Sequence, residues 1–174
     1  VFDAFGSYLR TIGAGPGGGD GQLEDPLFCA VDMDRELLFV SDSQNYRVQV
    51  FSYDGKFVRK WGSQGSSAGR FPDHPDGIAL DSDRGLVYVT DSYQYLHVFR
   101  MDGTFVSKWP VGESATGIAI DTKHNFAYIS RPHSHDIELF ALDGETVLRF
   151  GKRGSAAKEF KCPSSLYLDQ HEAR

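Results

Sequence analysis

The chain has 174 residues, of which 40% are hydrophobic and 13% aromatic, and its formal net charge is −6. This length and apolar share suit one folded domain and exclude a disordered acidic chain. No stretch approaches the ~18 apolar residues of a membrane-spanning helix, so we expect no membrane contact, and the acidity opposes a whole-surface attraction to nucleic acid. Cys29 and Cys162 are too few for a disulfide framework, which favours a reducing, cytoplasmic location. The start at Val1 rather than Met favours an excerpt from a longer polypeptide.

Four short strand patterns follow one another in the first full repeat. Residues 29–31, 37–40, 47–51 and 57–61 are apolar or alternating and rich in β-branched and aromatic side chains. Turn residues separate these runs, and the Asp54-Gly55 pair suits a hairpin turn in which φ is positive. No helical period of 3.6 residues intervenes. The segment therefore predicts an antiparallel sheet of four strands.

The same pattern returns twice more along the chain. Three segments that each contain an Asp-Gly pair align without gaps: VQVFSYDGKFVRKWG (48–62), LHVFRMDGTFVSKWP (96–110) and IELFALDGETVLRFG (137–151). A second shared block precedes each of them, at 29–43, 78–92 and 118–132. The repeats are about 40–49 residues long. Repeats of this length that are built from four short strands indicate the blades of a β-propeller.

We therefore predict an all-β propeller segment over 1–174, as a partial or unusually small propeller. Its complete blades are expected at about 26–62, 75–110 and 115–151, with partial blades at 1–13 and 163–174. Part of a longer ring is the favoured arrangement, and a four-bladed ring closed by strands from both termini is the alternative. Cys29 aligns with Ile78 and Ile118, so we expect it in the core.

The first full repeat also carries a recognisable order of residues. It contains Pro26, Val31-Asp32, Val40-Ser41-Asp42-Ser43, Asn45, Arg47 to Phe51, Gly55 and Trp61-Gly62. This order resembles the NHL repeat, and the resemblance covers essentially the whole chain. It implies a propeller of about six blades that serves as a binding platform. Relatives often carry this module behind a RING–coiled-coil ubiquitin ligase head, so the resemblance also implies such a head elsewhere in the polypeptide.

Two oppositely charged residues exchange places between repeats. Asp42 and Arg47 are five residues apart, and the equivalent positions of the third repeat hold Arg131 and Asp136. A catalytic pair would not survive this exchange, whereas an ion pair between neighbouring strands would. We therefore predict structural pairs, and Tyr95 in the second repeat indicates that the pair is dispensable.

Aromatic, histidine and basic residues occur where a propeller gathers its loops on one face. They lie in the turns between second and third strands and in the connections between blades. The predicted partner-binding residues are Asn45, Tyr46, Tyr93, Tyr95, His133, His135, Arg70, Lys152 and Arg153. Such a surface favours recognition of a protein. Single-stranded RNA is the alternative, because bases stack on aromatic rings and phosphates pair with Lys and Arg.

Catalytic and metal-binding interpretations find less support in the sequence. A metal-dependent lyase of the peptidylglycine-amidating type, the second alternative, resembles this fold but needs histidines at the heads of the inner strands. Those positions hold Phe28, Gly77, Gly117 and Ser165. Asp32 and its neighbours would suit turns as well as calcium. We predict no catalytic residue, no metal and no cofactor in this segment, and we expect the unpaired edges of the end blades to favour self-association.

Overall fold

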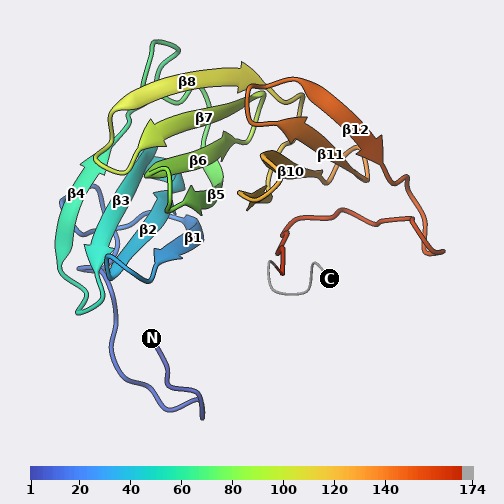
Figure 1. Cartoon of the computed structure of the whole chain (residues 1–174). Helices are drawn as coiled ribbons and strands as arrows, with labels where there is room; N and C mark the ends of the chain where they lie inside the picture. Colours follow the sequence, from blue (N-terminus) through green and yellow to red (C-terminus); the bar gives the residue numbers. More distant parts are fainter. Residues whose placement is uncertain (170–174) are drawn as a thin grey trace.

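The computed structural model of the protein describes residues 1–169. In this part of the chain, three separate four-stranded antiparallel sheets fan out side by side, and we call them blades 1 to 3 (Figure 1). Blade 1 consists of β1 (Pro26–Asp32), β2 (Leu37–Asp42), β3 (Arg47–Ser52) and β4 (Phe57–Trp61), with a short 3-10 helix, η1 (Ser43–Asn45), after β2. Blade 2 consists of β5 (Pro75–Asp81), β6 (Leu86–Asp91), β7 (Tyr95–Arg100) and β8 (Phe105–Pro110). Blade 3 consists of β9 (Ile118–Asp121), β10 (Phe126–Arg131), β11 (Asp136–Ala141) and β12 (Thr146–Phe150).

Each blade is a meander in which consecutive strands are neighbours. The first strand is innermost, and β4, β8 and β12 lie on the outside of the arc (Figure 1). The hairpins between third and fourth strands turn at Gly55, Gly103 and Gly144, whose φ values are 91°, 95° and 97°. Only glycine adopts this backbone without strain, which confirms the positive φ that the Asp-Gly pairs predict. No helix in the described chain is long and apolar enough to cross a bilayer.

The blades pack face to face, and the same two faces meet at both junctions. We call the face that a blade turns toward its N-terminal neighbour the leading face, and the opposite one the trailing face. The first junction joins two sets of buried residues, Phe39, Val48 and Val50 of blade 1 and Ile78, Val87, Val89 and Phe99 of blade 2. The second joins Tyr88, Leu96 and Val98 of blade 2 to Ile118, Ile120, Ala127, Ile129 and Phe140 of blade 3. Each strand thus alternates between the two faces, and a buried core fills both junctions.

The outer strands contribute aromatic side chains to these junctions. Trp61 of β4 lies 5.9 Å from the ring of Phe99 in the next blade, and the hairpin glycine Gly103 touches its indole. Trp109 meets Gly144 in the same way, since a Cβ there would lie 2.8 Å from the indole Cγ. These indoles join one blade to the next.

Cys29 is exposed, so the prediction that it belongs to the core is wrong. The aligned Ile78 and Ile118 are each 6% exposed, because a preceding blade covers them. Cys29 lies on the leading face of blade 1, where the described chain supplies no preceding blade. The apolar residues Leu27 and Val31 beside it remain 47% and 46% exposed for the same reason.

Within residues 1–169, the strands expected in the two partial blades are not formed. Residues 1–13 contain only the isolated bridge between Phe2 and Tyr8, and 163–169 contain no strand. Isolated strands are unstable without neighbours, and neither segment has a full sheet to join. The two segments therefore do not close a four-bladed ring. Residues 170–174 of the predicted C-terminal partial blade lie outside the described residues.

The C-terminal segment nevertheless lies where a next inner strand would begin. The Ser130 hydroxyl donates a hydrogen bond to the Ser164 carbonyl at 2.9 Å, just as the Thr90 hydroxyl donates to Thr116 at 2.8 Å in the preceding junction. Gly77 fits closely against Thr116, and Gly117 against Ser164, where a Cβ would collide with the carbonyl oxygen. Glycine at the head of an inner strand thus allows this close approach.

Aspartates that end the inner strands hold the first turn of each blade. Asp32 pairs with Arg35 at 2.8 Å and accepts its backbone N–H, and Arg35 also donates to the carbonyl of Ser82 in the next blade. Asp81 and Arg84 repeat the pair at 2.7 Å. In both blades the carboxylate oxygens serve the turn, as the turn-forming interpretation of these residues expects.

Candidate partner-binding face

The turns after β2, β6 and β10 and the connections between blades form one surface, which we call the loop face. It consists of residues 43–46, 92–94 and 132–135 together with 14–25, 62–74, 111–117 and 151–162. Backbone hydrogen bonds join turn to connection in successive blades: Gln44 N donates to Glu24, Ser92 N to His74, and Val111 N to Gln94. Backbone hydrogen bonds therefore hold the turns of blades 1 and 2 against the neighbouring connections.

A buried ion pair anchors the loop face of blade 1. The Arg47 guanidinium lies 2.5 Å from Asp42, and both side chains are almost inaccessible to solvent. Arg47 also donates to the carbonyls of Gly18, Gly19 and Gln22 at 2.8–2.9 Å, which fixes the preceding connection over the blade. Gln49 donates a further hydrogen bond to Asp42 at 2.9 Å.

Blade 3 carries the same pair with the charges exchanged. Arg131 lies 2.8 Å from Asp136 and 2.9 Å from Glu138, and all three residues are buried. Arg149 of β12 pairs with Glu138 at 2.8 Å from the exposed side. The hydrogen bond with Asp136 is the first cause that holds the pKa of Arg131 above its usual value. The exchanged charges thus form ion pairs at equivalent positions of blades 1 and 3. Both pairs are buried, so they are more costly to break than surface pairs.

Blade 2 replaces the arginine by a histidine two positions further along. His97 Nε2 lies 3.0 Å from Asp91, and neither side chain is accessible to solvent. The other carboxylate oxygen accepts the N–H groups of Tyr93, Gln94 and Tyr95, so Asp91 holds the whole turn. Sequence comparison missed this partner, although His97, Gln49 and Glu138 share one register on the third strands.

Four of the predicted binding residues are engaged within the protein. Asn45 donates to Asp42 and to the Gly17 carbonyl, and Tyr46 stacks on His74 with ring centroids 4.5 Å apart. Lys108 lies over the Tyr95 ring at 4.5 Å. His135 accepts the N–H of Cys162 at 3.1 Å. These residues shape the loop face and offer less free surface than the sequence suggests.

The other five predicted residues are exposed. Tyr93 is 50% exposed at the tip of the blade 2 turn, and His133 is exposed at the tip of the neighbouring blade 3 turn, where it meets the Ser114 hydroxyl. The remaining three of these five predicted residues are the cations Arg70, Lys152 and Arg153. The structure therefore leaves an aromatic ring, an imidazole and three cations open to a partner.

Sequence analysis also missed a group of polar residues at the head of β5. His74 bonds the Ser43 carbonyl at 3.1 Å and the Tyr46 hydroxyl at 3.3 Å, which joins blades 1 and 2. Asp76 beside it is 6% exposed and accepts the Ser92 hydroxyl at 2.9 Å. Burial raises the pKa of the Asp76 carboxyl, with Asp73 adding like charge. The signal in the sequence is the run from Asp73 to Asp76, which has two carboxylates and a histidine immediately before an inner strand.

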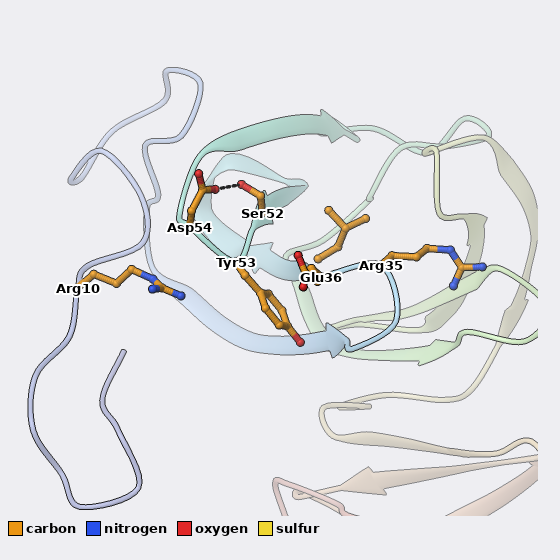
Figure 2. Close-up of a pocket in the computed structure, with 7 residues that line it drawn as sticks. Arg10, Arg35, Glu36, Ser52, Tyr53 and Asp54 are labelled. Carbon is orange, nitrogen blue, oxygen red and sulfur yellow. Dashed lines mark hydrogen bonds between the residues drawn. The ribbon is translucent and has the colours of Figure 1, made fainter.

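Other hollows lie away from the loop face. A pocket of about 520 Å³ on the opposite side is lined by Arg10 from the N-terminal segment and by the turns after β1 and β3. Figure 2 shows Tyr53 and Asp54 in this pocket, with Arg10 on one side and Arg35 on the other. Among residues 1–169, no group of three or more His, Cys, Asp or Glu side chains is arranged to hold a metal ion.

Two curated relatives match the chain in sequence. The protein brain tumor of Drosophila melanogaster is 28% identical over 136 residues, which cover 76% of this chain and 13% of that protein. The RING finger protein nhl-1 of Caenorhabditis elegans is 39% identical over 79 residues, which cover 45% of this chain and 8% of that protein. The chain thus spans about an eighth or less of these relatives.

Solved structures share the fold at low identity. The chain matches a structure from the nidogen/laminin complex with a TM-score of 0.65 and 22% identity, covering 82% of this chain and 52% of that one. It matches the periplasmic gluconolactonase of Pseudomonas aeruginosa with a TM-score of 0.62 and 19% identity, covering 86% and 42%. Because one of these two proteins is named as an enzyme and the other as part of a complex, the fold alone does not decide the function.

A family model described as a 6-bladed beta-propeller matches residues 29–136. This span begins within β1 of blade 1, includes all of blade 2 and ends at Asp136, the first residue of β11 in blade 3. The chain therefore belongs to the six-bladed β-propeller family, and its repeats are of the NHL type.

Proposed function

We propose that this protein is a non-catalytic platform that recognises a protein partner through its loop face. The observation that carries the proposal is the pair of exposed tips, Tyr93 and His133, on neighbouring blades whose turns are fixed by buried charges. Aromatic rings held on a rigid support contribute strongly to protein interfaces, because little conformational freedom is lost when they bind.

The exposed tips give the proposal a direct test. Tyr93→Ala with His133→Ala should abolish capture of a specific partner in a pull-down, while the thermal unfolding midpoint stays unchanged. Asp83→Ala with Lys123→Ala is the matched control, since both residues are exposed on the first turns of the same two blades, away from the loop face. Equal loss of the partner in the control variant would contradict the assignment of the face.

Single-stranded RNA remains the second candidate because of the charge of one connection. Residues 151–162 contain Lys152, Arg153, Lys158 and Lys161 against the single carboxylate of Glu159. If this face binds RNA, the affinity of a single-stranded oligonucleotide should fall steeply between low and high salt. Absence of binding at low salt would remove this candidate.

The relatives suggest what the platform does within the full polypeptide. Because one relative is named as a RING finger protein, we propose that the platform brings a partner to a ubiquitin ligase head in the full polypeptide. A cytoplasmic location is part of the same proposal. The apolar leading face of blade 1 is where another blade or a second chain would pack.

A further inference from the structure

The connections that follow blades 1 and 3 have the same local structure. In the first connection, Gln64 forms an isolated parallel β-bridge with Phe71, and in the second, Arg153 forms one with Phe160. Gly65 N donates to Phe71 at 2.9 Å, and the equivalent Gly154 N donates to Phe160 at 3.1 Å. The two loops therefore align residue for residue from 62–71 to 151–160.

Each loop presents a serine at the same exposed position, but the residues before it differ. Ser66 follows Ser63 and Gln64, whereas Ser155 follows Lys152 and Arg153. A serine with basic residues two and three positions before it is the charge pattern that basophilic protein kinases select, because their substrate grooves are acidic. Only the second loop offers this pattern, in the segment Lys152-Arg153-Gly154-Ser155.

We propose that Ser155 is a phosphorylation site for a basophilic serine kinase. The γ-phosphoryl group of ATP passes to the Ser155 Oγ, so that an Oγ–P bond forms as the bond to the ADP oxygen breaks. The hydroxyl proton passes to the catalytic carboxylate of the kinase, and ADP leaves.

The loop is accessible to such an enzyme. Residues 155–158 are exposed, and the loop is held by short hydrogen bonds of its own, from Phe160 N to Lys152, Gly154 N to Phe160, Glu159 N to Ala156 and Ala156 N to the Glu159 carboxylate. Lys152 pairs with Glu159 at 3.3 Å but is 77% exposed. All of these bonds lie within a single solvent-exposed loop, and exposed loops open locally at a low cost in free energy, so the chain around Ser155 can extend into a kinase groove.

A phosphate at this position would change the charge of the loop. The Glu159 carboxylate already accepts the Ala156 N–H at 3.0 Å, and this bond, followed by the pair with Lys152, holds the pKa of Glu159 below its usual value. A phosphoserine adds about −1.5 to −2 charges beside that carboxylate and competes with it for Lys152. Residues 151–162 hold four cations and one carboxylate, so the phosphate would neutralise about half to two-thirds of their net positive charge. The consequence for binding rests on the proposed function, whereas the modification does not.

The modification is tested on the purified chain with the catalytic subunit of a basophilic kinase and ATP, with phosphopeptides mapped by mass spectrometry. We expect phosphate at Ser155 and none at Ser66. Ser155→Ala should remove the signal, and Lys152→Gln with Arg153→Gln should lower the initial rate by about tenfold or more.

The equivalent loop after blade 1, residues 62–71, supplies a gain-of-function control. Ser63→Lys with Gln64→Arg builds the same charge pattern before Ser66, so this variant should acquire a second phosphate at Ser66. The proposal is overturned if Ser155 stays unmodified, if its rate is unchanged without Lys152 and Arg153, or if Ser66 is modified equally fast in the unaltered chain. None of these outcomes depends on a binding partner, so they are distinct from failure of the proposed function.

Discussion

Removal of the Arg47 guanidinium should destabilise the protein by about 3 kcal/mol, near the lower end of the cost of breaking a buried ion pair. Arg47→Met keeps the length of the side chain but removes its donors to Asp42 and to three carbonyls of the preceding connection. Asp42 would remain buried, with Asn45 and Gln49 still donating to its carboxylate, which limits the loss.

The loss corresponds to a fall of about 6–12 °C in the unfolding midpoint for a chain of this size. Tryptophan fluorescence during heating measures it, because Trp61 and Trp109 both pack at blade junctions. Asp42→Asn combined with Arg47→Met should cost less than the sum of the single changes, with a coupling energy of about 1–2 kcal/mol.

An exposed ion pair provides the control. Lys56 lies 2.5 Å from Asp54, but their side chains are 82% and 54% exposed. Lys56→Met should therefore leave the midpoint unchanged. If Arg47→Met proves no more harmful than Lys56→Met, the buried pair does not anchor the connection and the reasoning fails.

Three further changes test individual features of the fold. Burial raises the pKa of the Asp76 carboxyl in the folded protein, so the folded state loses stability as the pH rises from the unfolded pKa to the folded one. Asp76→Asn should therefore raise the thermal unfolding midpoint at pH 7, and equal midpoints for the two proteins at pH 7 would contradict this prediction. Gly144→Ala places a Cβ 2.8 Å from the Trp109 indole at a φ of 97°, and chemical denaturation should show a loss of about 1–3 kcal/mol. Ile78→Ala should cost about 2–5 kcal/mol in the same assay, while the aligned but exposed Cys29→Ala should cost almost nothing.

The blades were predictable because their determinants are local. Alternation of apolar residues and the Asp-Gly turns specify each hairpin within about forty residues, and the repeats reinforce one another. Cys29 shows where this fails. Its alignment with Ile78 gives the correct strand and the correct face, but its burial depends on a neighbouring blade that the sequence pattern cannot supply.

The loop face was predictable in position but less so in detail. Tyr93 and His133 are exposed as turn residues usually are, whereas Asn45 and Tyr46 turn back onto the connections. The pairing of Asp91 with His97 joins two strands across a turn. Propensity says nothing of such a contact, and comparison at the arginine position pointed to Tyr95 instead.

Because both junctions join a trailing face to a leading face in the same register, the repeats are interchangeable units. If one whole repeat were deleted, the trailing face of the blade before it would meet the leading face of the blade after it. The expected product is therefore a shorter arc rather than an unfolded chain. Gain of a repeat would lengthen the arc on the same terms. Since each blade also has its own charged anchor, one unit can diverge on its loops without disturbing the next.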